Sequence, residues 1–155
     1  MARAVVQLHA LEGIVKGRLV FEQATYEAPT TIVGEVTGLT PGLHAISINM
    51  FGDIASSESV GQHFNPHSKN HGAPGDDERH VGDLGNIEVN ADGRAAVKVS
   101  DAKLKLIGPL SVIGRSFCIA KRQDDSGKGG HESSLRNGNA GELGAVGVVG
   151  IMPSA

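Results

Sequence analysis

Eight short runs of β-prone residues, separated by turn signals, constrain the fold of this chain more than any other feature. The runs cover residues 3–10, 15–23, 30–38, 43–51, 85–93, 94–101, 111–120 and 144–152. Between two of them, Gly93 in the turn NADG accepts the positive φ of a tight hairpin. No run has helical periodicity. The pattern therefore predicts an all-β fold, an eight-stranded sandwich or flattened barrel, in one domain spanning 1–155.

One of these runs, within GLHAISINMFGD at 42–53, has two unlike faces. Alternation places His44, Ile46, Ile48 and Met50 on one face and Ala45, Ser47, Asn49 and Phe51 on the other. A polar strand face usually meets water. The alternative is that the face of Ser47 and Asn49 is the floor of a site, and this run alone leaves both interpretations open.

Charge and composition exclude two classes of partner. With 14 Lys and Arg against 17 Asp and Glu, and only 3% aromatic residues, the chain offers no basic or stacking surface for nucleic acid. No apolar run approaches the ~18 residues that span a membrane, so no membrane partner is expected.

The N-terminal MARAVVQLHALEG contains no signal-peptide core, so we expect a cytoplasmic location. The one cysteine, Cys118, forms no internal disulfide, and we expect a buried, inert thiol.

Two segments, 52–84 and 121–143, are long, polar and rich in Gly, His and Asp, and loops of this kind are usually functional. Within 21 residues the first one contains His63, His67, His71, His80 and Asp83. Three imidazoles and one carboxylate make a closed tetrahedral zinc site. A bound ion also offsets the ~1–2 kcal/mol per residue that ordering such a loop costs. The spacing alone leaves open the alternative of a solvated, histidine-rich loop.

Five longer motifs occur in one order along the chain. They are GLTPGLH, HFNPHSKNHGAPGDDERHVGDLGN, VIGRS, DDSGKGG and GNAGELGAVGVVGI. Through these motifs the sequence resembles the copper/zinc superoxide dismutases over nearly its whole length. The resemblance implies an eight-stranded Greek-key barrel that carries a zinc loop and an electrostatic loop. It also implies a homodimer whose interface would contain Val5, Phe51, Gly52, Ile113, Gly114, Val148, Gly150 and Ile151.

The resemblance implies that this chain has a complete zinc site. The positions that match the family's four zinc ligands are His63, His71, His80 and Asp83. Asp124 matches the carboxylate that links the zinc and copper sites, where a carboxylate behind a ligating imidazole fixes the ring's orientation. His44 matches a structural histidine inside the barrel, and His67 has no family role.

The copper site departs from the family pattern. Ser47, Asn49 and Ala120 stand where the family has copper-binding histidines, and only His63, the family's bridging ligand, remains. Ser and Asn are poor copper ligands, and Ala is none. Leu143 replaces the arginine that guides superoxide to the metal. The loss of three ligands and of this charge predicts that copper does not bind.

Other departures agree with that interpretation. Ser133 replaces a glutamate of the electrostatic loop. The family's intrasubunit disulfide is missing, because Val146 stands at one cysteine position and Ser57 or Glu58 at the other. Zinc has no redox chemistry in proteins, so a zinc-only chain cannot dismutate superoxide.

Two alternatives to an inactive, independent homodimer remain. One is an active or weakly active superoxide dismutase that uses both copper and zinc. The other is a regulatory or decoy subunit that forms a heterodimer with a true superoxide dismutase or with its copper chaperone.

Overall fold

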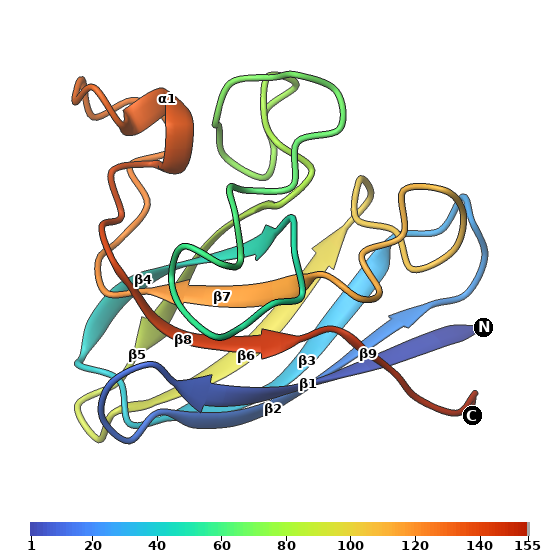
Figure 1. Ribbon diagram of the computed structural model, residues 1–155, viewed down its shortest axis with the longest axis horizontal. Helices are drawn as coiled ribbons and strands as arrows, with labels where there is room; N and C mark the ends of the chain where they lie inside the picture. Colours follow the sequence, from blue (N-terminus) through green and yellow to red (C-terminus); the bar gives the residue numbers. More distant parts are fainter. Residues whose placement is uncertain (155) are drawn as a thin grey trace.

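The computed structural model describes residues 1–154, which form an antiparallel β-structure with one short helix (Figure 1). The strands are β1 (Ala2–Ala10), β2 (Lys16–Gln23), β3 (Thr30–Thr37), β4 (Gly42–Asn49), β5 (Asp83–Val89), β6 (Arg94–Asp101), β7 (Ser116–Ala120), β8 (Leu143–Val148) and β9 (Gly150–Ile151). The helix α1 (Ser134–Asn137) lies between β7 and β8. The prediction of an all-β fold is confirmed.

The strands form a nearly closed barrel. Their order in the sheet is β5-β4-β7-β8-β1-β2-β3-β6, every pairing is antiparallel, and the short β9 also pairs with β1. The two ends of this order, β5 and β6, are joined by a tight turn in which Asn90 and Arg94 share a backbone hydrogen bond. Gly93 in that turn has φ 78°, as the sequence predicts. The connections are those of the expected Greek-key barrel.

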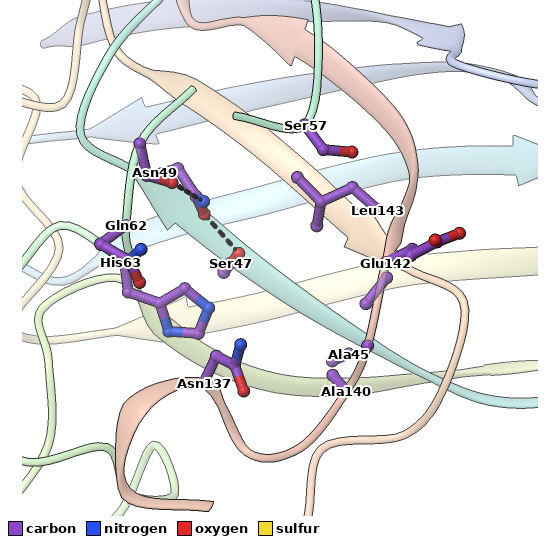
Figure 2. A pocket seen from close by; sticks show the side chains of 13 residues that line it. Ala45, Ser47, Asn49, Ser57, Gln62, His63, Asn137, Ala140, Glu142 and Leu143 are labelled. Atoms are coloured by element: carbon purple, nitrogen blue, oxygen red, sulfur yellow. Dashed lines mark hydrogen bonds between the residues drawn. The ribbon is translucent and has the colours of Figure 1, made fainter. Parts of the chain in front are cut away.

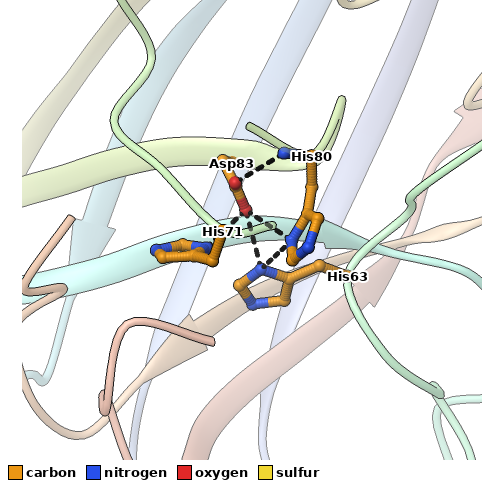
Figure 3. A group of neighbouring side chains, drawn as sticks. All are labelled: His63, His71, His80 and Asp83. Atoms are coloured by element: carbon orange, nitrogen blue, oxygen red, sulfur yellow. Dashed lines mark hydrogen bonds and ion pairs between the residues drawn. The ribbon is translucent and has the colours of Figure 1, made fainter. Parts of the chain in front are cut away.

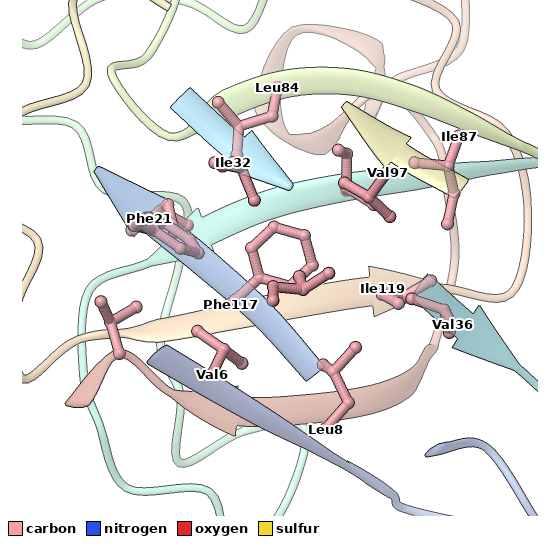
Figure 4. Close-up of a cluster of buried hydrophobic side chains, with 14 of the residues drawn as sticks. Val6, Leu8, Phe21, Ile32, Val36, Leu84, Ile87, Val97, Phe117 and Ile119 are labelled. Atoms are coloured by element: carbon pink, nitrogen blue, oxygen red, sulfur yellow. The ribbon is translucent and has the colours of Figure 1, made fainter. Parts of the chain in front are cut away.

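The barrel interior is filled by the inward faces of the strands (Figure 4). Phe21 of β2 and Phe117 of β7 meet edge to face, with ring centroids 6.1 Å apart and planes at 87°. Ile46 and Ile48 of β4 are fully buried in the same core, as their alternation predicts. Burying each such side chain stabilises the fold by about 1.5–3 kcal/mol. The core therefore fixes the direction of the opposite face of β4, where Ser47 and Asn49 lie.

Apart from shifts of strand ends by a few residues, the structure differs from the predicted elements in three places. The run 111–120 is a strand only from Ser116 onward, because Arg115 donates a backbone hydrogen bond to Val112 in a turn and Gly114 has φ 89°. The last run divides into β8 and β9. The short helix α1 was not predicted, and a single helical turn is too short to show periodicity.

Two long loops, 50–82 and 121–142, cover the outer face of β4 and β7. In Figure 1 the first loop passes across β7 in teal and then rises above the strands in green, and the second, in orange, carries α1 beside it. They correspond to the two predicted loops, although β5 begins at Asp83, two residues earlier than the run at 85–93 indicates. Within residues 1–154, no helix combines the length and apolar character that crossing a membrane requires.

Candidate metal centre

Four side chains converge under the first loop: His63, His71, His80 and Asp83 (Figure 3). The Asp83 Oδ1 atom lies 2.8 Å from His63 Nδ1, 2.7 Å from His71 Nδ1 and 3.1 Å from His80 Nδ1. The Nδ1 atoms of His63 and His80 are 3.4 Å apart. All four potential ligand atoms lie within 4.8 Å of one another. His67 is exposed and lies outside this cluster.

The backbone positions this cluster. Asp83 is the first residue of β5, and its Oδ2 accepts hydrogen bonds from the amides of His80 (2.7 Å) and Gly72 (3.0 Å). These amides leave Oδ1 directed at the imidazoles. His63 forms an isolated β-bridge with Asn49 at the end of β4, so the loop returns to the barrel wall at this point. The cluster is therefore attached to two strands of the barrel.

Asp124 links the two long loops through the cluster. Its Oδ1 atom lies 2.6 Å from His71 Nε2, and both side chains are buried. The same oxygen accepts the Ser126 amide at 2.8 Å, while Asn86 of β5 accepts the Asp124 amide at 2.7 Å. A carboxylate behind a ligating imidazole fixes the ring and its tautomer. His71 is thereby oriented with Nδ1 toward Asp83.

Electrostatics within the cluster favour an ionised Asp83. Burial opposes its charge, but hydrogen bonds from His63, His71 and His80 hold the pKa of Asp83 well below its usual range. Burial lowers the pKa of His63. For His71, burial opposes protonation, yet the hydrogen bonds to Asp124 and Asp83 raise its pKa to about 9. A metal that binds here must displace a proton from this network, as metal ligation by imidazole requires.

The donor set fits zinc. Three imidazole nitrogens and one carboxylate oxygen are a common set for structural zinc, with bonds of about 2.0–2.2 Å in a tetrahedron. The edges of such a tetrahedron are about 3.3 Å. Four of the six distances between these atoms are 2.8, 2.7, 3.1 and 3.4 Å, and all six are within 4.8 Å. The backbone amides on Asp83 and the carboxylate on His71 supply the outer support that such ligands need.

Beside the cluster lies a cavity of ≈ 160 Å³, which we call the β4 pocket (Figure 2). Its lining residues are Ala45, Ser47, Asn49, Ser57, Gly61, Gln62, His63, Ala120, Asn137, Ala140, Gly141, Glu142 and Leu143. Ser47 and Asn49 are only 4% and 5% exposed, so the polar face of β4 is a pocket floor rather than a solvated surface. Ser47 Oγ donates to Asn49 Oδ1 at 2.7 Å, and Asn49 Nδ2 donates to the carbonyl of Gly61 at 2.8 Å.

The residues of the β4 pocket do not fit copper. His63 is the only imidazole among its lining residues, and Ala120 contributes no donor. The hydroxyl of Ser47 and the amide of Asn49 are poor copper ligands and are already bonded to each other. Leu143 lines the pocket where the resemblance implies an arginine.

Three other residues that the sequence analysis names, His44, Cys118 and Ser133, are buried outside the four-residue cluster. The ring of buried His44 lies between two backbone carbonyls, with Nδ1 2.8 Å from Ala120 O and Nε2 2.8 Å from Thr40 O. Cys118 is fully buried in β7, as expected, and burial raises the pKa of its thiol to about 12. Ser133 is buried at the start of α1.

Arg79, which is not among the predicted site residues, holds the end of the first loop. Its buried guanidinium pairs with Asp101 of β6 at 2.8 Å and donates to the carbonyls of His80 (2.9 Å) and Val81 (2.9 Å). The position of Arg79 beside the candidate ligand His80 in DDERH only weakly indicates a buried structural role, since most arginines are exposed.

Comparison with protein-family models matches residues 15–149 to "Copper/zinc superoxide dismutase (SODC)". The match covers both long loops, the four clustered side chains and the β4 pocket. It agrees with the nearly closed antiparallel barrel. The chain therefore belongs to the copper/zinc superoxide dismutase family.

Proposed function

We propose that this chain is a superoxide dismutase-like protein that holds one structural zinc and does not dismutate superoxide. The zinc ligands are His63, His71, His80 and Asp83, and Asp124 positions His71. Zinc held by these residues would supply a structural centre without redox chemistry. The chain's own residues then tie the first loop to β5 through Asp83 and to the second loop through Asp124.

The observation that carries the proposal is the floor of the β4 pocket. Dismutation needs a metal that accepts and returns an electron. At this floor Ser47 and Asn49 satisfy each other by a hydrogen bond, and His63 is the single imidazole facing the cavity. One imidazole leaves copper without the nitrogen-rich ligand set it prefers.

Charge near the pocket supports the same proposal. Fast capture of a small anion relies on a positive potential at the site. Leu143 places an uncharged alkyl group at the pocket. The neighbouring Glu142 forms an ion pair with Lys121 on the surface, with the two charged groups 3.1 Å apart. Lys121 also pairs with Glu12 at 3.5 Å. Lys121, next to the lining residue Ala120 in the sequence, is thus paired with two carboxylates.

A homodimer is part of the proposal. The segments of the predicted interface lie together: Val5 pairs with Gly150, and Gly114 donates to the carbonyl of Val149 at 2.8 Å. Phe51, Val148 and Ile151 are 53%, 37% and 81% exposed. Exposed apolar residues grouped on one face suit a two-fold contact between copies. The same face would serve a heterodimer with a true superoxide dismutase or its copper chaperone.

A superoxide-dismutation assay tests the inactive state. The protein is loaded with zinc, exposed to excess Cu²⁺, and freed of loosely bound metal before the assay. An active copper/zinc superoxide dismutase treated in parallel shows that the loading procedure works. We expect the rate of buffer alone. Activity that co-purifies with the folded protein at a substantial fraction of the control's would contradict the proposal.

A further inference from the structure

The β4 pocket remains a formed cavity even though its residues do not fit copper. We infer that it binds a small neutral molecule of one five-membered ring with adjacent ring N and N–H atoms, that is, an azole of the pyrazole type. This inference rests on the proposed function, because a pocket filled by copper would have no room for such a ring.

The volume of the pocket sets the size of the ligand. A cavity of about 150 Å³ is enough to bind benzene, and a water molecule occupies about 30 Å³. The β4 pocket holds ≈ 160 Å³. One small ring therefore fits, whereas a nucleoside or a peptide side chain with its backbone does not.

The polar part of the pocket lining offers both a donor and an acceptor. In Figure 2 the ring of His63 reaches into the pocket near Ser47 and Asn137. With Nδ1 of His63 directed at Asp83, a zinc ligated there leaves the proton on Nε2, which becomes a donor toward the pocket. Ser47 uses its own hydrogen on Asn49, so its Oγ offers lone pairs.

The opposite end of the pocket is apolar. Ala45, Ala120 and Ala140 form a buried cluster against which Leu143 packs. Because these side chains are small and apolar, they leave room for the carbon atoms of a ring. An azole would place its acceptor nitrogen at His63 Nε2, its N–H at Ser47 Oγ and its carbon atoms against these alanines.

The charge of the site selects a neutral ligand. The floor consists of an uncharged hydroxyl and an amide, and Leu143 supplies no cation. The carboxylate of Glu142 lies at the pocket but is paired with Lys121 at 3.1 Å. No lining side chain carries a positive charge, so an anion entering the pocket would lose hydration without meeting a cation on its walls, which is costly.

The test is a titration of zinc-loaded, copper-free protein with pyrazole, followed by NMR. Pyrazole is neutral and carries adjacent acceptor and donor nitrogens. We expect saturable shifts of the Asn49 side-chain amide and the His63 imidazole, with a dissociation constant on the order of millimolar, as a ligand of so few atoms allows. 1-Methylpyrazole lacks the donor and should bind weakly, and formate, which tests an anionic ligand, should not bind.

Three variants locate the site. Ser47→Ala keeps the shape but removes the acceptor, and it should weaken pyrazole binding about 3- to 10-fold, the effect of one hydrogen bond. Ala140→Leu should fill the cavity and abolish binding. Ala96→Leu adds the same atoms at an exposed position of β6 and should leave binding unchanged.

The outcomes separate this inference from the proposed function. Absence of saturable pyrazole binding to folded, zinc-loaded protein overturns the azole site while leaving the inactive enzyme intact. The azole site is also overturned if formate or 1-methylpyrazole binds as well as pyrazole, or if Ala140→Leu, confirmed as folded by its spectrum, binds normally. If stoichiometric copper displaces bound pyrazole, the azole site stands and the proposed function fails.

Discussion

Ser47 donates a 2.7 Å hydrogen bond to Asn49 two residues further along β4, and both side chains are almost fully buried beside His63. Asn49 in turn donates to Gly61 at 2.8 Å. This chain of bonds gives the floor of the β4 pocket a stable arrangement without any ion, since buried polar groups need partners. The first loop is held at the same point through Gly61.

Restoring imidazoles should restore copper binding. In the triple variant Ser47→His, Asn49→His and Ala120→His, the new rings replace residues that all line the cavity beside His63. We expect about one equivalent of copper per chain at this set of four imidazoles, a ligand type that suits the metal. Single replacements should bind little. Metal analysis and the visible spectrum of Cu²⁺ measure the result.

Adding Leu143→Arg to the triple variant should raise its dismutase activity and make it sensitive to salt. Steering by an exposed charge acts over a screening length of about 8 Å at 0.15 M ionic strength. The control is the triple variant with Leu143 retained. A folded, zinc-loaded triple variant that takes up no copper would refute the view that these positions are an emptied metal site.

Asp124→Asn should weaken zinc binding about 10- to 100-fold, the usual effect of losing a carboxylate behind a metal ligand. The carboxylate lies 2.6 Å from His71 Nε2 and connects the two loops. Asp125→Asn is the matched control, because the Asp125 side chain bonds to Ser134 and Gly127 in the same loop. Competition with a chromophoric chelator measures both affinities. Equal zinc affinity in the two variants would contradict the role of Asp124.

Because of Cys118, the free energy of unfolding should fall as the pH rises above 9. Its pKa is about 12 in the folded protein, raised by burial from 9.0. Because the folded pKa lies above the unfolded one, this contribution to stability is fully present below pH 9 and is lost as pH rises toward 12. The Cys118→Ala variant should therefore lose less stability than the parent protein between pH 9 and 12. Chemical unfolding at several pH values measures the free energy of unfolding of both proteins. A thiol reagent at pH 8 should label the parent only when it unfolds.

The dimer should depend on Ile151. Ile151→Asp places two negative charges, one from each copy, in a two-fold contact, and like charges in an interface are strongly unfavourable. We expect a monomer by light scattering at concentrations where the parent is a dimer. Val33→Asp on β3 is the control, since Val33 is 54% exposed and lies outside the proposed interface. A monomeric parent with zinc bound would remove the dimer from the proposal.

Alternation and turn signals in the sequence predict an all-β fold of the sandwich or barrel type. The spacing of His63, His71, His80 and Asp83 suggests a metal site but leaves a solvated loop open, and the family resemblance of the motif HFNPHSKNHGAPGDDERHVGDLGN identifies the four as one ligand set. The hydrogen bond between Ser47 and Asn49 could not be predicted, since it depends on the loop that buries this face. The buried pair of Arg79 and Asp101 spans 22 positions and likewise depends on tertiary packing.

The most direct test of the account is the metal content of the folded protein after exposure to both zinc and copper. Elemental analysis follows gel filtration, which removes free metal. We predict one zinc per chain, held by His63, His71, His80 and Asp83, and no stoichiometric copper. A full equivalent of copper alongside the zinc would contradict the account.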